Sequence, residues 1–338
     1  MKAVVLTKHG LPSVLKISEV PTPQPSAQQV RVKVQAIGLN YAEVLSRKGL
    51  YRWAPKLPYI LGMEAYGEID AIGPDVEQRR VGEQVIVGAQ YGSYAEAIVV
   101  PELQALPALD GYAPEENAAF AVNYLTAWVG LVKLARLQPS DRVLIQAAGG
   151  GVGTAAVQLA KGFGCTVYGT AGSETKIERL AQLNIDHAVN YRRFDFEPEI
   201  RALTQGRGVD VVLETVGGEV YRKSLRLLAP FGRIVVLGFA GLDLQKWNPL
   251  SWWRTWRAMP RASLGRMAVK SYGVMASHLG YQLRDTARLL ETWEELTSFV
   301  RQHHIRPVVG TVLPFADIAK AHALMESRQS YGKIVLKL

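Results

Sequence analysis

The chain has 338 residues, more than one hydrophobic core usually organises, so two domains are expected. Its single cysteine, Cys165, excludes an intramolecular disulfide and zinc sites built from several cysteines, and the six histidines show no metal-ligand spacing. The formal charge of +9 is uneven, because residues 246–270 hold six cations and no acid. Such a basic balance suits nucleic acid, anionic lipid or a phosphorylated cofactor. The first apolar run, 3–6, is too short for a secretory signal and is interpreted as a strand, and the single cysteine agrees with a reducing setting, so a cytoplasmic protein is expected.

Residues 1–122 are predicted to form a β-rich domain. Their apolar segments are short and are separated by prolines and glycines, which is typical of a sandwich or barrel. The predicted strands are 3–6, 30–37, 65–72, 84–87 and 95–100. A helical apolar period between 118 and 133 then marks a change of architecture.

Residues 123–276 are predicted to form an α/β domain with a doubly wound parallel sheet, because strands and helices alternate there at the spacing of βαβ units. The predicted strands are 142–146, 166–170, 187–191, 210–216, 233–238 and 271–276, and the helices are 152–163, 174–183 and 220–228. Residues 277–338 continue with a helix at 285–302 and then a strand, a helix and a strand. We expect this last segment to return to the first domain.

The run 147–153, AAGGGVG, lies between a predicted strand and an apolar-faced helix. Glycines let the backbone turn sharply and approach a pyrophosphate, whose charge then faces the helix N-terminus. We therefore predict dinucleotide binding through Gly150, Gly151, Val152 and Gly153. The alternative is a turn with a purely structural role.

The second predicted strand of this domain ends without the acidic residue that usually binds the ribose 2′-hydroxyl of NAD. The sequence there is GTAGS at 169–173, and Glu174 is expected in the first turn of the next helix, where it would stabilise the helix dipole. No carboxylate would repel a 2′-phosphate, so NADPH is the predicted cofactor. The residues expected near that phosphate are Gly172, Ser173, Lys176, Tyr191 and Arg192.

Six stretches of the chain carry a family pattern: 37–51 (IGLNYAEVLSRKGLY), 61–73 (LGMEAYGEIDAIG), 124–128 (YLTAW), 147–153, 209–217 (VDVVLETVG) and 332–336 (GKIVL). Together they resemble the medium-chain dehydrogenase/reductase superfamily, in its zinc-independent quinone oxidoreductase branch. The segment after Gly238 and the phrase HLGY at 278–281 are most similar to the synaptic-vesicle membrane protein members. The resemblance implies a GroES-like β-barrel substrate domain joined to a Rossmann domain.

Zinc-dependent members of the superfamily have Gly, His and Glu where this chain has Gly62, Met63 and Glu64, and they need cysteine ligands that it lacks. We therefore predict no bound metal and no metal-polarised alcohol oxidation. The expected reaction is the reduction of a small electron-poor acceptor, a quinone or an α,β-unsaturated carbonyl compound.

The resemblance implies that Asn40, Tyr51 and Thr126 are catalytic, with Tyr51 or Asn40 donating to the acceptor carbonyl. Each has an alternative: Asn40 caps a helix that begins at Tyr41, Tyr51 packs, and Thr126 bonds to its own helix. Cofactor contacts at the nicotinamide end are implied for Asn40, Thr126, Val216, Gly238, Phe239 and Lys333.

Residues 247–267 contain four tryptophans among four arginines. We interpret them as a lid or pocket wall with buried tryptophans, against two alternatives, a peripheral contact with anionic lipid and a partner surface. The lipid alternative belongs to a second hypothesis, an NADPH-binding, membrane-associated module with little or no turnover. The resemblance also implies a homodimer through edge pairing of strand 271–276. No recognition motif predicts nucleic acid as a partner.

Overall fold

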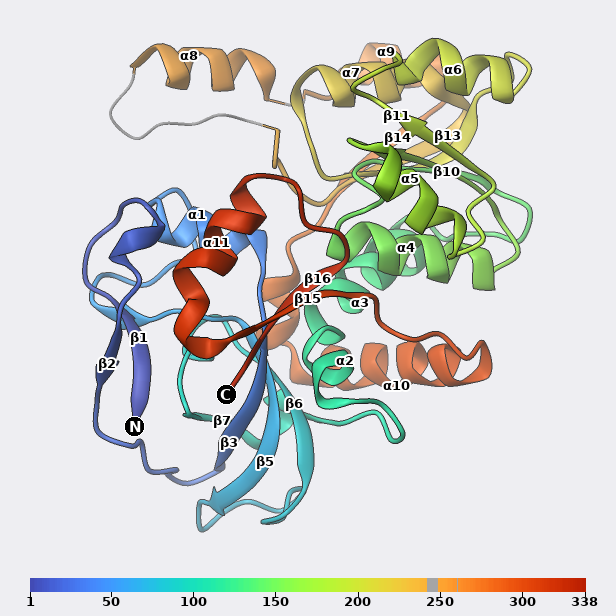
Figure 1. Cartoon of the computed structure of the whole chain (residues 1–338). Coiled ribbons are helices and arrows are strands. Elements are labelled where there is room, and N and C mark those ends of the chain that lie inside the picture. The colour runs from blue at the N-terminus through green and yellow to red at the C-terminus, as the bar shows by residue number, and fades with distance from the viewer. Residues whose placement is uncertain (242–248, 260) are drawn as a thin grey trace. The chain divides into compact units, whose positions relative to one another are not determined.

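The computed structural model describes residues 1–241, 249–259 and 261–338 (Figure 1). These residues form two compact units. The first comprises Met1–Leu125 and Leu279–Leu338, and the second comprises Thr126–His278.

The first unit is built around β3 (Gln29–Gly38), which pairs with three other strands. Val30, Val32 and Val34 alternate along β3 and are buried, as expected for a strand with one face in the core. The sheet runs in the order β15-β16-β3-β5-β6-β8, with β7 also on β3, and a smaller sheet has the order β2-β1-β4. The other strands are β1 (Lys2–Leu6), β2 (Ile17–Glu19), β4 (Tyr59–Ile60), β5 (Glu64–Ile72), β6 (Gln84–Gly88), β7 (Ala97–Pro101), β8 (Ala105–Pro107), β15 (Val309–Pro314) and β16 (Lys333–Lys337).

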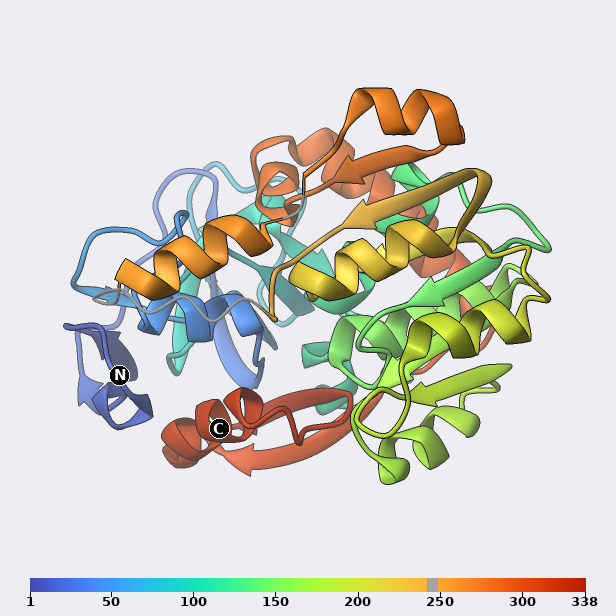
Figure 2. The same cartoon turned by 90° about the horizontal axis from the view of Figure 1, so that it is seen from above.

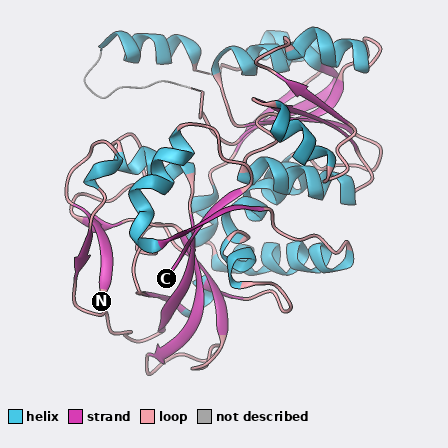
Figure 3. Ribbon diagram, in the orientation of Figure 1, coloured by secondary structure: helices cyan, strands magenta, loops and turns pink. Residues whose placement is uncertain are grey.

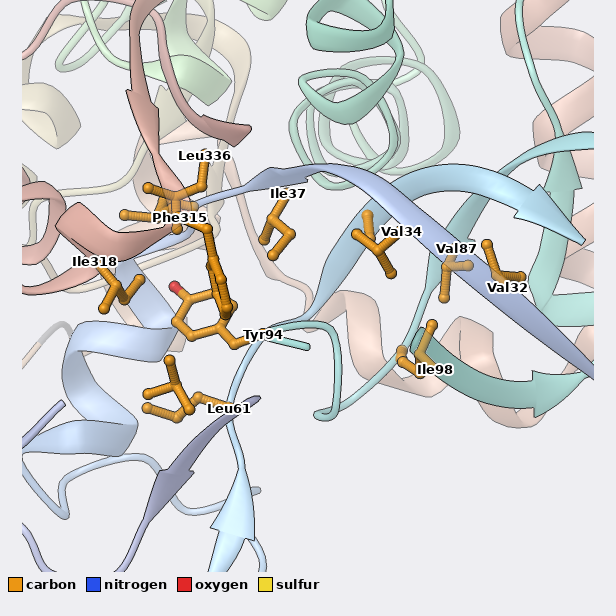
Figure 4. Packing of buried hydrophobic residues seen from close by; sticks show 14 of the residues in the cluster. Val32, Val34, Ile37, Leu61, Val87, Tyr94, Ile98, Phe315, Ile318 and Leu336 are labelled. Atoms are coloured by element: carbon orange, nitrogen blue, oxygen red, sulfur yellow. The ribbon is translucent and has the colours of Figure 1, made fainter. Parts of the chain in front are cut away.

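The C-terminal segment completes the core of this unit. β16 pairs antiparallel with β3, and β15 pairs parallel with β16, which confirms the predicted return of the tail. Figure 4 shows the ring of Tyr94 among apolar side chains. Leu61 comes from the N-terminal part of this unit, and Phe315 and Ile318 come from its C-terminal segment. The helical elements of this unit include α1 (Tyr41–Arg47), α2 (Pro114–Ala118), η4 (Leu279–Arg284), α10 (Thr286–Gln302) and α11 (Ile318–Glu326).

The second unit contains a parallel sheet in the order β11-β10-β9-β12-β13-β14 (Figures 2 and 3). In Figure 1, α6 and α7 lie on one side of this sheet and α4 and α5 on the other. The order reverses between β9 and β12, so the sheet is doubly wound, as predicted. Its strands are β9 (Arg142–Ile145), β10 (Thr166–Ala171), β11 (His187–Asn190), β12 (Val209–Glu214), β13 (Leu228–Val236) and β14 (Gly273–Ala276), and its helices include α4 (Gly151–Gly162), α5 (Glu174–Ala181), α6 (Phe196–Leu203), α7 (Gly218–Leu227), α8 (Pro249–Ala258) and α9 (Leu264–Lys270).

The apolar stretch 118–133 is not the single regular helix that its period suggested. α3 (Ala121–Trp128) continues as a π-helical segment, η3 (Val129–Leu134). A Cβ on Gly130 would lie 2.8 Å from Leu213, so the backbone here packs directly against β12. Sequence reasoning also missed α6, α9 and three short strands, β2, β4 and β8, because such short elements carry little periodic signal.

Candidate functional site

The glycine-rich turn joins β9 to α4 within the second unit. The N–H groups of Ala147 and Ala148 donate to Thr170, to Oγ1 at 3.2 Å and to the carbonyl oxygen at 2.8 Å, which fixes the turn to the end of β10. Gly153 has no room for a side chain, since a Cβ would lie 2.7 Å from Ala148 Cα. α4 begins at Gly151, so the N–H groups of its first turn have no intrahelical acceptor and suit a phosphate.

Three side chains predicted to contact the 2′-phosphate meet beside this turn. The Lys176 side chain crosses Gly149, where a Cβ would lie 3.1 Å from Lys176 Cδ. A Cβ on Gly172 would lie 2.6 Å from Tyr191 Oη and 3.5 Å from Arg192 Nε. Burial and, second, the charge of Arg192 lower the pKa of Lys176, so the two cations lie close enough to repel each other. A polyanion placed here would relieve that repulsion.

The carboxylate of Glu174, the first residue of α5, is bonded to residues other than Lys176 and Arg192. Glu174 Oε1 accepts from Asn190 Nδ2 at 2.9 Å and from Arg193 at 3.1 Å, and these hydrogen bonds lower the pKa of Glu174. Ser173 is the N-cap of α5, and its hydroxyl accepts from the N–H of Lys176 at 3.3 Å. The Glu174 carboxylate is therefore engaged by other partners, and the start of α5 is capped by Ser173.

Glu214 orders the turn that follows β12. It is completely buried, and its Oε1 accepts from the N–H of Val216 at 2.6 Å and of Gly217 at 3.1 Å. Its Oε2 is buried without a hydrogen-bond partner among the described residues. Burial raises the pKa of Glu214, and the hydrogen bonds from the backbone oppose that rise.

The segment after β13 is fixed to the same turn. The N–H of Ala240 donates to the carbonyl of Thr215 at 3.0 Å, and that of Gly241 donates to Val216 at 2.8 Å. Gly238 and Phe239 lie directly before these donors, and Phe239 is exposed. The structure thus brings together the two segments predicted to flank the nicotinamide.

In the first unit, Asn40 belongs to a buried polar cluster. Asn40 Oδ1 accepts from Lys333 Nζ at 2.8 Å, and Asn40 Nδ2 donates to Glu64 at 3.0 Å. Lys333 also forms an ion pair with Glu64 and contacts Asn123 Oδ1 at 3.5 Å. Gly38 makes room for this cluster, since a Cβ there would lie 2.8 Å from both Glu64 and Lys333. The Asn40 amide and the Lys333 ammonium are therefore committed to partners inside this unit.

The cluster continues through Glu43 into the core. Glu43 accepts from the N–H groups of Asn40 and Met63, each at 2.8 Å, and from the hydroxyl of Tyr94, which lies 3.0 Å from His322 Nε2. Asn40 is the N-cap of α1, as in the alternative predicted for it, and the Glu43 carboxylate accepts from its N–H in a capping box. Burial raises the pKa of Glu43 to about 7 and lowers that of His322 to about 3.

Tyr51 and Thr126 lie in different units. Tyr51 is half-buried, Gln90 Nε2 lies 3.4 Å from its Oη, and burial raises the pKa of the phenol. Thr126 is half-buried on α3. Their catalytic roles stay predictions.

Sequence reasoning missed Glu43, Tyr94 and His322. The Asn-x-x-Glu spacing of 40–43 is a capping-box signal that predicts the Glu43 contact. No local pattern predicts Tyr94 or His322, because they are 228 positions apart and only the tertiary fold joins them.

The Trp- and Arg-rich segment differs from its prediction where it is described. Trp253 is 53% and Trp256 63% exposed, so these two are not buried in a lid; Trp247 lies outside the described residues. Across the described residues, no group of three or more His, Cys, Asp or Glu side chains is arranged to hold a metal ion. Among all the helices that the structure describes, none has the length and apolar character needed to cross a membrane.

Two family models match the chain: the alcohol dehydrogenase GroES-like domain over residues 26–110 and the zinc-binding dehydrogenase over residues 151–293. The "Synaptic vesicle membrane protein VAT-1 homolog" of Homo sapiens is 34% identical over 340 residues, covering 99% of this chain and 86% of that protein.

Solved structures also resemble the chain over almost its whole length. Quinone oxidoreductase of Escherichia coli, crystallised with NADPH, superposes with a TM-score of 0.89 at 28% identity over all of both chains. The CurK enoyl reductase superposes with a TM-score of 0.84 at 30% identity, covering 99% of this chain and 98% of that one. The chain therefore belongs to the medium-chain dehydrogenase/reductase superfamily, in its quinone oxidoreductase branch.

Proposed function

We propose that this protein is an NADPH-dependent reductase of quinones or α,β-unsaturated carbonyl compounds. The observation that carries the proposal is the meeting of Lys176, Tyr191 and Arg192 beside the glycine-rich turn, with Glu174 held by other partners. Two cations and a phenol suit the adenosine 2′-phosphate, and the first turn of α4 suits the pyrophosphate. The NADPH complex of the Escherichia coli relative supports the same cofactor.

When bound, the nicotinamide supplies a hydride from its C4 to the electron-poor acceptor. The chain must hold the acceptor and polarise its carbonyl, for which a well-placed donor contributes about 10²-fold or more in rate. We assign this donor to Tyr51, because the Asn40 amide hydrogens already face Glu64 and Glu43. Asn40 and Lys333 then shape the wall of the site.

The test is NADPH oxidation with a panel of quinones, enones and enals, repeated with NADH. We expect acceptor-dependent turnover and tighter binding of NADPH than NADH. The variant Tyr51→Phe should lose about 10²-fold in kcat while NADPH still binds. Equal affinity for the two nicotinamides would contradict the phosphate assignment, and unchanged turnover by Tyr51→Phe would remove Tyr51 from the mechanism.

We also propose a homodimer through β14, which pairs with β13 at one end of the described sheet. An unpaired strand edge is a ready template for a second copy. Size-exclusion chromatography with light scattering should give twice the mass of the chain. A monomer would contradict this.

A second candidate function, binding to anionic lipid, is favoured by one observation on α8. Arginine side chains stack on the exposed rings of Trp253 and Trp256. Arg257 Cζ lies 4.8 Å from the ring centre of Trp253, and Arg261 Cζ lies 4.2 Å from that of Trp256. Indole rings beside arginines suit a headgroup region. Co-sedimentation with vesicles containing phosphatidylserine, but not with phosphatidylcholine alone, would support it. Absence of salt-sensitive binding would exclude it.

A further inference from the structure

A cation stacked on two aromatic rings lies in the first unit, near Tyr51. The Arg284 guanidinium carbon is 4.7 Å from the ring centre of Trp53 and 5.9 Å from that of Tyr281. The two rings meet edge to face, with centres 4.7 Å apart and planes at 85°. Stacking fixes the plane of a guanidinium while its N–H groups remain directed outward from its edge.

Three segments come together around this stack. Trp53 follows Tyr51 by two residues, and Gln90 Nε2 lies 3.4 Å from Tyr51 Oη. Leu283 of η4 would lie 3.6 Å from a Cβ on Gly88, so η4 packs beside the segment that carries Gln90. The stack and the proposed carbonyl donor are thus on the same part of this unit.

The charged side chains of these three segments are all cations. Residues 50–58, 88–92 and 279–284 contain Arg52, Lys56 and Arg284 and no Asp or Glu. The next acid, Asp285, caps α10 by accepting from the N–H of Arg288 at 3.2 Å, and its carboxylate lies 3.5 Å from Arg288 Nε. Among the described residues, Arg284 has no carboxylate partner, and it is exposed.

We propose that Arg284, held on Trp53 and Tyr281, binds an anionic group of the acceptor, so that the substrate class is a quinone or enone carrying a carboxylate, sulfonate or phosphate away from its reacting carbonyl. A guanidinium edge binds such oxyanions through paired N–H donors. This inference rests on the proposed reductase function.

The test compares 1,2-naphthoquinone-4-sulfonate with neutral 1,2-naphthoquinone as acceptors for the full chain and NADPH. Arg284→Gln should raise KM for the sulfonate about tenfold, the effect of one charge-assisted hydrogen bond, with kcat and the neutral acceptor unchanged. In the wild type, added salt should raise KM for the sulfonate only. Arg288→Gln, which removes a cation four residues away that pairs with Asp285, is the matched control and should change neither acceptor.

An equal loss for both acceptors, or no loss for the sulfonate, would overturn the inference. If the wild type oxidised no NADPH with either quinone, the reductase proposal would fail, and the subsite would be judged by calorimetry with 2-naphthalenesulfonate, which accepts no hydride. In that measurement, the anion subsite is supported if Arg284→Gln binds 2-naphthalenesulfonate about tenfold more weakly than Arg288→Gln does. Equal binding by both variants refutes it.

Discussion

The two units use charge in opposite ways. In the first unit, Glu43, Glu64 and Lys333 are buried and bonded to one another or to neighbouring polar groups. In the second unit, Arg192 is exposed and close to Lys176 at the edge of the sheet, and the carboxylate of Glu174 is bonded to Asn190 and Arg193. Buried charges with fixed partners hold a wall in place, whereas clustered cations at an open edge are suited to a ligand. Substitutions of these buried charges in the first unit should therefore affect stability, and substitutions of the clustered cations in the second should affect affinity.

The largest effect is expected from Lys333→Met. It leaves Glu64 buried without its ion-pair partner, which should lower the free energy of unfolding by about 3–5 kcal/mol. Denaturant unfolding measures this. The control is Lys337→Met on the same strand, whose partner Glu115 is near the surface, and it should change stability by about 1 kcal/mol at most. If both variants lowered the free energy of unfolding equally, burial of the Lys333–Glu64 ion pair would not explain the effect.

The second effect is a dependence of stability on pH. Because burial raises the pKa of Glu43 to about 7 from 4.5, the folded state binds a proton that the unfolded state releases, so stability falls as pH rises from 4.5 to 7. The contribution is about 3 kcal/mol, since each unit of pKa corresponds to about 1.4 kcal/mol. His322 acts in the opposite sense, because its lowered pKa makes stability fall as pH drops from 6.5 toward 3.

Glu43→Gln isolates the first of these contributions. Unfolding by urea across this pH range should show that the variant lacks the Glu43 component of the slope, whatever its absolute stability. An unchanged slope would mean that Glu43 titrates normally. His322→Gln should remove the opposing component instead.

The third prediction concerns the second unit. Arg192→Gln should weaken NADPH binding about tenfold or more, through the loss of a charge-assisted hydrogen bond to the 2′-phosphate, and leave NADH binding unchanged. Fluorescence titration with both cofactors measures this. Arg193→Gln, which removes the partner of Glu174, should preserve the preference for NADPH. A parallel loss of both cofactors in Arg192→Gln would argue against a phosphate contact.

The smallest effect is expected at Glu214, where a buried carboxyl serves the second unit as a positioning group. Glu214→Leu removes the acceptor for the N–H groups of Val216 and Gly217 and should weaken NADPH binding several-fold, roughly the cost of one or two unmet hydrogen bonds. Glu214→Gln keeps an acceptor oxygen for the two N–H groups, so it should bind NADPH as the wild type does. If Gln were as damaging as Leu, the acceptor oxygen alone would not position this turn.

The sequence by itself determined that the second unit holds a doubly wound parallel sheet, since βαβ spacing and the glycine-rich turn are local patterns within about 30 residues. It also predicted that residues 172–176 and 191–192, which we propose for the 2′-phosphate, lie at one sheet edge, because they follow the ends of the neighbouring parallel strands β10 and β11. Only the tertiary structure showed the partners of Asn40, whose amide is bonded to Lys333, 293 positions away, and to Glu64. It alone showed that Trp253 and Trp256 are exposed. Local periodicity reports which residues share a face, but burial of a polar side chain depends on partners that distant segments supply.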